Sequence, residues 1–180
     1  MYTSTKSTFG DFERIDVRND IGSGFAIVPS QGACLLDLRF GNIPVLDGYQ
    51  TGEELAVAKW SKSRILLPFP NRLEDGTYHW QGKDYYFPIK EQERKVSVHG
   101  FKMHELPFTV EETQVEKDTA SITLRYEHDA THPSYPFPFS ATVRYEMDEA
   151  EGFQITFWVK NEGKMAIPMG LGWHPYFKLD

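Results

Sequence analysis

The C-terminal part of the chain alternates apolar and polar residues with a period of two. The pattern is clearest in FSATVRYEM (139–147) and in FQITFWVK (153–160). One side of the first stretch carries the apolar residues Phe139, Ala141, Val143, Tyr145 and Met147. Such alternation is typical of half-buried strands. The short polar loop DEAEG lies between the two stretches, so we predict a β-hairpin here.

The same period predicts further strands upstream. ITLRYE alternates through 122–127, and TYHW and YYFPI flank the turn QGKD, which predicts a second hairpin across 77–89. Further strands are expected at 25–28, 33–40, 106–114 and 165–173.

One stretch, TGEELAVAKW (51–60), is a helix candidate, because Thr51 and Glu54 have capping-box spacing. Proline concentrates in PFPNR and HPSYPFPF, which we assign to loops because proline removes a donor from a strand ladder. The chain is therefore predicted to be all-β, with antiparallel strands forming a sandwich or a barrel-like pair of sheets.

Length and composition narrow the class. The chain has 180 residues, so we expect one domain across 1–180. Aromatic residues make up 14%, which favours β structure and surfaces that stack on ring-shaped ligands. The net charge of −7 argues against nucleic acid and mildly disfavours a phosphorylated substrate. A neutral or cationic ligand fits this balance better.

The cysteine content and the N-terminal sequence indicate the cellular compartment. Cys34 is the only cysteine, so an intrachain disulfide is impossible, and its apolar surroundings favour a buried, inert thiol. The N-terminus lacks the apolar core of a signal peptide, and no apolar run is long enough to span a membrane. We therefore expect a cytoplasmic protein without a membrane partner.

Three stretches pair a polar side chain with turn residues. They are Asn71-Arg72 in LPFPNRLEDG, His99 in VSVHGF and His174 in GWHPYF. A glycine after His99 permits a close backbone approach, and a proline after His174 forces extended backbone at the end of a strand. We therefore expect His174 to lie at the end of a strand with its ring free to project into a cleft.

Structural interpretations compete with each of these sites. Arg72 has the acids Glu74 and Asp75 nearby as ion-pair partners, and we interpret Glu91 and Glu93 as solvated.

The remaining histidines and aromatics also have ordinary explanations. His128 and His132 lie four residues apart, but a third ligand signature is missing, so we predict no metal site. Trp173, Tyr176 and Phe177 are more typical of a core than of a stacking platform.

The three motifs together resemble one family. PFPNRLEDGTYHWQGKDYYFP, VHGF and GLGWHPYFKL, in this order, resemble the aldose 1-epimerase (galactose mutarotase) family, where Asn-Arg, His-Gly and His-Pro-Tyr-Phe occur in the same sequence order. The upstream VPSQGACLLDLRFGNIPVLDGY resembles the family's opening strands. The resemblance thus covers nearly the whole chain.

This resemblance implies a fold, an activity and residue roles. The fold would be the large antiparallel sandwich of galactose mutarotases, and the activity would interconvert the α and β anomers of free aldohexoses without metal or cofactor. His174 corresponds to the family's general acid, which protonates the ring oxygen. His99 corresponds to the second histidine and Arg72 to the arginine that hydrogen-bonds sugar hydroxyls, with Asn71 beside it in the substrate site.

One part of the family's machinery has no counterpart. The family's general base is a glutamate far downstream of His-Pro-Tyr-Phe, and Asp180 does not match the downstream aspartate that binds substrate. We therefore expect an N-terminal portion of such an enzyme, truncated at its C-terminus, inactive alone and able to self-associate through uncovered sheet edges.

Two alternatives remain open. The first is a non-catalytic carbohydrate-binding module of the same fold. The second is a hexose-6-phosphate 1-epimerase, which would need extra basic residues at the cleft. We see no such cluster beside the three motifs in the sequence.

Overall fold

The four-stranded sheet is built on the strictest alternation in the sequence. A computed structural model describes residues 1–179, and in it β13 (Phe139–Asp148) and β14 (Gly152–Asn161) form the predicted hairpin. β12 (Thr119–His128) and β11 (Thr109–Val115) extend it in the antiparallel order β11-β12-β13-β14. Every second residue of β13 is buried, as the period-two pattern requires.

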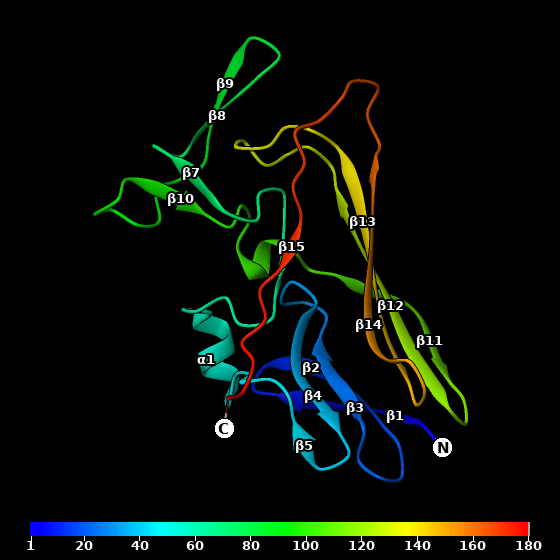
Figure 1. Ribbon diagram of the computed structural model, residues 1–180. Coiled ribbons are helices and arrows are strands. Elements are labelled where there is room, and N and C mark those ends of the chain that lie inside the picture. The colour runs from blue at the N-terminus through cyan, green and yellow to red at the C-terminus, as the bar shows by residue number, and fades with distance from the viewer. Residues whose placement is uncertain (180) are drawn as a thin grey trace.

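A second, five-stranded sheet holds the N-terminal residues in simple sequence order (Figure 1). Its strands are β1 (Thr3–Phe9), β2 (Phe12–Arg18), β3 (Gly24–Val28), β4 (Cys34–Phe40) and β5 (Ile43–Pro44). We had predicted β3 and β4 but not the β1–β2 hairpin. β1, TSTKSTF, is an edge strand exposed on both faces, so it carries almost no hydrophobic period.

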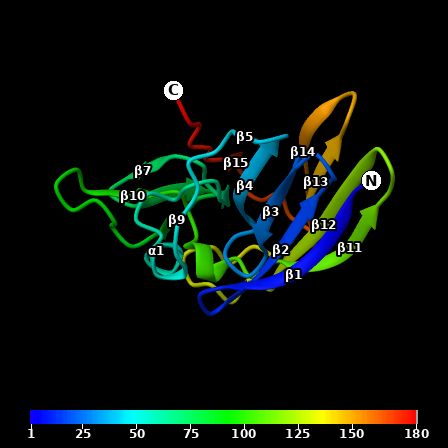
Figure 2. The same ribbon diagram turned by 90° about the horizontal axis from the view of Figure 1, so that it is seen from below.

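The core lies between the two sheets. Tyr145 of β13 is fully buried, packs on Phe25 of β3 with ring centroids 6.1 Å apart, and donates its hydroxyl to the carbonyl of Ala33 at 2.6 Å. Figure 2 shows β1 running beside β11, where the backbone N–H of Tyr2 also bonds to the carbonyl of Glu116. The molecule is thus the predicted antiparallel sandwich.

The apolar face of β14 is less covered than that of β13. Its inward side chains pack against the core but remain partly exposed, and they are Phe153, Ile155, Phe157 and Val159. β14 is also an edge of its sheet.

The outer face of β3 and β4 is covered as well. A second cluster joins Val28, Leu36 and Leu55, where Leu55 belongs to the short helix α1 (Gly52–Val57). Thr51 caps α1 as predicted, but the helix ends before residue 60 because Ala58 adopts a left-handed conformation. The rest of the expected helix becomes a loop that leads to β6.

Short strands complete the fold (Figure 1). β6 (Ile65–Leu66) pairs with β15 (Gly172–Trp173), and β7 (Arg72–Glu74) pairs with β10 (Val96–Val98). β8 (Thr77–Trp80) and β9 (Lys83–Tyr86) form the second predicted hairpin.

Two boundaries differ from our expectation. The turn of the β8–β9 hairpin is only Gln81-Gly82, both with positive φ, because a two-residue turn of this kind matches the twist of the strands. Of the strand expected at 165–173, only Gly172–Trp173 pairs as a strand, whereas Ile167 and Met169 pack against the core without strand pairing.

Within residues 1–179, no helix has the length and apolar character needed to cross a membrane.

The buried Tyr145 hydroxyl gives a test of the sandwich core. Tyr145→Phe leaves the Ala33 carbonyl without this donor, so we expect a loss of about 1–2 kcal/mol in the free energy of unfolding, measured by urea denaturation. Tyr86→Phe is the matched control, because Tyr86 is 62% exposed, and it should change stability by less than about 0.5 kcal/mol. Equal effects of the two substitutions would contradict the proposed packing.

Candidate active site

The β6–β15 pair carries His174 to the centre of the fold. Gly172 pairs with Leu66 and Trp173 with Ile65, and the ladder continues as the His174 N–H donates to the Arg64 carbonyl at 3.2 Å. Pro175 follows and has no N–H, so the ladder ends there. As the proline predicted, His174 lies in extended chain at the end of a strand.

The β7–β10 pair brings the other two motifs together. Arg72 pairs with Val98, and the N–H of the next residue, His99, donates to the carbonyl of Asn71 at 3.1 Å. Residues 71–72 and 99 therefore become neighbours although they are far apart in the sequence. The backbone register, rather than any side-chain contact, makes this connection.

Gly100 fixes the position of the His99 loop. It has a positive φ of 56°, and a Cβ at this position would overlap the carbonyl oxygen of Leu67. The close approach lets the N–H of Phe101 donate to that same carbonyl at 2.8 Å. His99 itself also has a positive φ, 62°, which is uncommon for a residue with a side chain.

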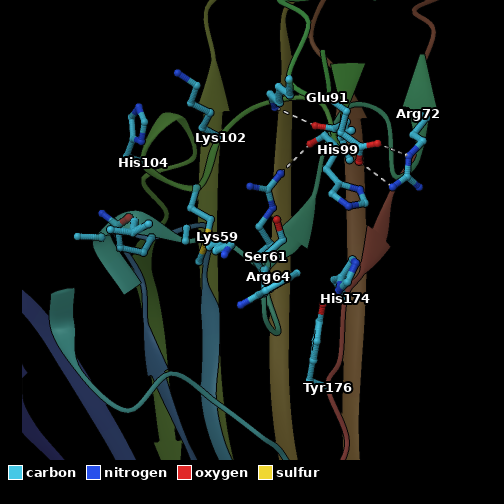
Figure 3. Close-up of a pocket in the computed structure, with 18 residues that line it drawn as sticks. Lys59, Ser61, Arg64, Arg72, Glu91, His99, Lys102, His104, His174 and Tyr176 are labelled. Carbon is cyan, nitrogen blue, oxygen red and sulfur yellow. Dashed lines mark hydrogen bonds and ion pairs between the residues drawn. The ribbon is translucent and has the colours of Figure 1, made fainter. Parts of the chain in front are cut away.

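A pocket of about 570 Å³ opens where these segments meet (Figure 3). This volume suits a small ligand. His174, His99 and Arg72 all line it, together with Tyr176. Asn71 is exposed and does not line the pocket within the described chain; its side-chain oxygen accepts from the Arg72 N–H at 2.9 Å.

The two site histidines are in contact. Their ring centroids are 5.0 Å apart with the rings nearly perpendicular, and the His174 ring stacks on Tyr176 at 5.4 Å. The Nδ1 atom of His174 is buried and has no hydrogen-bond partner among residues 1–179. Buried polar atoms normally have a partner, so this atom marks an incomplete hydrogen-bond network.

The protonation state of His99 follows from its surroundings. Burial is the main cause that lowers its pKa to about 4, and the charges of Arg64, His174 and Arg72 lower it further. The ring is therefore neutral at pH 7. Its Nδ1 lies 3.0 Å from the Pro70 carbonyl, which only accepts, so Nδ1 carries the proton and Nε2 is left as an acceptor.

Arg72 is paired with an acid that we had interpreted as solvated. Its Nη2 lies 2.8 Å from Oε1 of Glu91, and this pair raises the pKa of Arg72 and lowers that of Glu91. Neither Glu74 nor Asp75 is its partner among residues 1–179. The reason is geometric: strand pairing places Arg72 beside the segment that follows β9, which nearness in sequence does not reveal.

Arg64 is a site residue that the sequence patterns missed. Its Nη2 donates to the carbonyls of His99 and Phe101, both at 2.8 Å, on either side of Gly100. Only 4% of the residue is exposed. The signal in the sequence was that Arg64 directly precedes the apolar run ILLP. A charged side chain buried beside such a run must have a specific role.

Basic residues from outside the three motifs also reach the pocket. Lys59, Lys90 and Lys102 line it with Arg64, although the sequence shows no basic cluster beside the three motifs. The sequence hid the cluster because these residues come from separate loops.

The other singled-out residues serve the fold. His128 is buried, with Nε2 2.8 Å from the Tyr135 carbonyl. Cys34 is buried and burial raises the pKa of its thiol, as an inert thiol requires. Across residues 1–179, no three His, Cys, Asp or Glu side chains are arranged to hold a metal ion.

Comparison with known proteins identifies the fold and the family. The fold is that of galactose mutarotase-like proteins: a structure from Clostridium acetobutylicum matches with a TM-score of 0.83 at 22% identity, over 98% of this chain and 54% of that one. A galactose 1-epimerase from Lactobacillus acidophilus matches with a TM-score of 0.80 at 15% identity, over 99% and 53%. The aldose 1-epimerase family model matches residues 13–180. The chain therefore belongs to the aldose 1-epimerase family.

Two uncharacterized proteins of Escherichia coli K12 are similar in sequence. YihR is 31% identical over 156 residues, which is 86% of this chain and 47% of YihR. YphB is 27% identical over 152 residues, which is 84% of this chain and 48% of YphB. The chain thus spans about half the length of the curated relatives it matches.

The Gly100 contact gives a test of the site's framework. Gly100→Ala forces a Cβ against the Leu67 carbonyl, so we expect the free energy of unfolding to fall by about 2–4 kcal/mol in urea denaturation. Gly82→Ala is the control: Gly82 also has a positive φ, but its Cβ would meet open space, so only about 1 kcal/mol should be lost. Similar losses for both would show that the close approach is unimportant.

The depressed pKa of His99 gives a test of its burial. In the unfolded chain the His99 ring is protonated below its ordinary pKa of about 6.5. In the folded chain it is protonated only below about pH 4. The stabilising contribution of His99 is thus complete above pH 6.5 and is lost as the pH falls towards 4. Between pH 7 and 4.5, His99→Gln should lose about 1–3 kcal/mol less stability than the wild type. Equal losses, or an NMR titration midpoint of the His99 ring near 6.5, would contradict this.

Proposed function

We propose that this site interconverts the α and β anomers of free hexoses by acid/base opening and closing of the sugar ring. Family membership supports an isomerase of this type. The observation that carries the proposal is the meeting of His174, His99 and Arg72 in one pocket. Ring opening requires one proton to reach the ring oxygen while another leaves the C1 hydroxyl.

We assign the acid role to His174. Histidine is the side chain whose ordinary pKa best suits proton donation near neutral pH. Its contact with His99 disfavours a positive charge on both rings at once, and His99 is the ring that stays neutral. Because His99 stays neutral, the proton-donating role is assigned to His174.

His99 and Arg72 are proposed to hold the sugar. The free Nε2 of neutral His99 accepts a hydrogen from a sugar hydroxyl, whereas the Arg72 guanidinium donates to hydroxyl oxygens. Asn71 supports this arrangement indirectly, because its side chain accepts from the Arg72 backbone rather than facing the pocket. Tyr176 offers an aromatic face beside them.

The base is assigned to no residue of this chain. Glu91 is the one carboxylate among the described residues that line the pocket, and Arg72 holds it at 2.8 Å. A carboxylate with a lowered pKa in an ion pair is a weak base and a poor acceptor for the C1 proton. We therefore propose that these 180 residues alone have little activity.

The pairing of Glu91 with Arg72 leaves no free carboxylate among the described residues that line the pocket. This favours a second candidate, a carbohydrate-binding module that keeps the fold without catalysis. The two candidates differ in one respect, which is whether a free base reaches the pocket in the complete gene product.

Polarimetry tests the proposal. Protein expressed from the complete gene should accelerate the decay of optical rotation of fresh α-glucose or α-galactose, and His174→Asn should lower kcat by a factor of about 10²–10⁴, the usual contribution of an acid. Decay at the buffer rate would overturn the activity, and in that case measurable sugar binding by calorimetry would favour the non-catalytic module. The 180 residues alone should stay near the buffer rate, and near-normal activity would show that the base lies within them.

A further inference from the structure

We propose that the pocket selects aldoses that carry an anionic group, with Arg64, Lys59 and Lys102 forming the subsite for that group. The inference rests on the proposed function and narrows its substrate class.

The charge of the pocket is opposite to that of the molecule. Five cationic side chains line it, Lys59, Arg64, Arg72, Lys90 and Lys102, against one carboxylate, Glu91. The whole chain carries −7. Arg72 and Glu91 pair with each other, and the other four cations form no salt bridge within residues 1–179. An anion from outside is the missing partner.

Arg64 is the strongest member of this set. A buried charge is costly unless it is paired, yet this guanidinium meets only backbone carbonyls. Both bonds use Nη2; Nε is buried without a partner, and Nη1 makes no hydrogen bond within the described chain. Burial lowers its pKa to about 10, so it remains charged at pH 7.

The lysines are placed around Arg64. Lys90 donates to the carbonyls of Val98 at 2.8 Å and Gly100 at 2.6 Å, which leaves one of its three donors free. Lys59 comes from the loop after α1, and Lys102 caps the short helix η1 (Met103–Glu105). Figure 3 shows Lys59, Lys102 and His104 on the opposite side of Arg64 from Arg72.

This separation divides the pocket into two ends. His99, His174 and Arg72 occupy one end, and Lys59 and Lys102 occupy the other. Mutarotation needs a free hydroxyl at C1, so a glycosyl phosphate cannot react. The anionic group must be elsewhere on the sugar, and an oxyanion on C6, as a phosphate or a carboxylate, meets this condition.

Calorimetric titration of the chain tests the subsite at constant total charge. The ligands are glucose, glucose 6-phosphate, glucuronate and inorganic phosphate. The site variant is Lys59→Gln/Lys102→Gln, and the control is Lys83→Gln/Lys117→Gln, two exposed lysines outside the pocket. Both variants remove two positive charges, so any difference between them reports position.

We expect at least one of the two anionic sugars to bind about tenfold or more tightly than glucose, equivalent to about 1.4 kcal/mol. The site variant should lose most of that preference and keep its affinity for glucose, whereas the control keeps both. Preference for the phosphate or for the carboxylate distinguishes the two sources of charge.

Three results would overturn the inference. They are equal binding of glucose and both anionic sugars, equal losses in the two variants, and inorganic phosphate binding as tightly as glucose 6-phosphate. If glucose and both anionic sugars bind equally, the result still supports a sugar site in this pocket. If no sugar binds at all, the proposed function fails with the inference.

Discussion

The backbone of the buried segment 63–67 is the element on which the site depends. It hydrogen-bonds to three distant parts of the chain: to Leu35 of β4 and residue 32 in the turn before it, to His174 beyond β15, and to Phe101 beyond β10. Each partner brings a different part of the pocket. Arg64 lies within this segment and adds side-chain bonds to the His99 loop. Every N–H and carbonyl of a buried backbone needs a hydrogen-bond partner. Here that requirement brings the parts of the site together.

Much of the fold was predictable because alternation records burial directly. The β13–β14 hairpin and β12 follow strict period-two patterns, and their inward residues lie in the core. The β1–β2 hairpin was not predictable, because an exposed edge strand such as β1 leaves no hydrophobic record of its pairing. The expectation of a strand across 165–173 was wrong because burial alone does not produce strand pairing. The apolar residues of this segment pack on the core as extended chain with little ladder pairing.

The site was predictable only as far as single motifs allow. His99, His174 and Arg72 were found because each motif combines a polar residue with distinctive turn chemistry, and all three line the pocket. Arg64 and the lysines escaped because their role depends on which loops meet in space. Glu91 escaped for the same reason, since its partner is nineteen residues away in the sequence.

The contrast between the basic pocket and the acidic chain has a kinetic consequence. At about 0.1 M salt, charges interact over only about 10 Å, so the negative surface neither attracts nor strongly repels a distant anion. The positive pocket acts once the anion is inside, where burial reduces screening. For the proposed anionic ligand, such a pocket acts mainly by lengthening the stay of a ligand that has already entered. In that proposal Arg64, which two carbonyls hold in place, bears mainly on the rate of release.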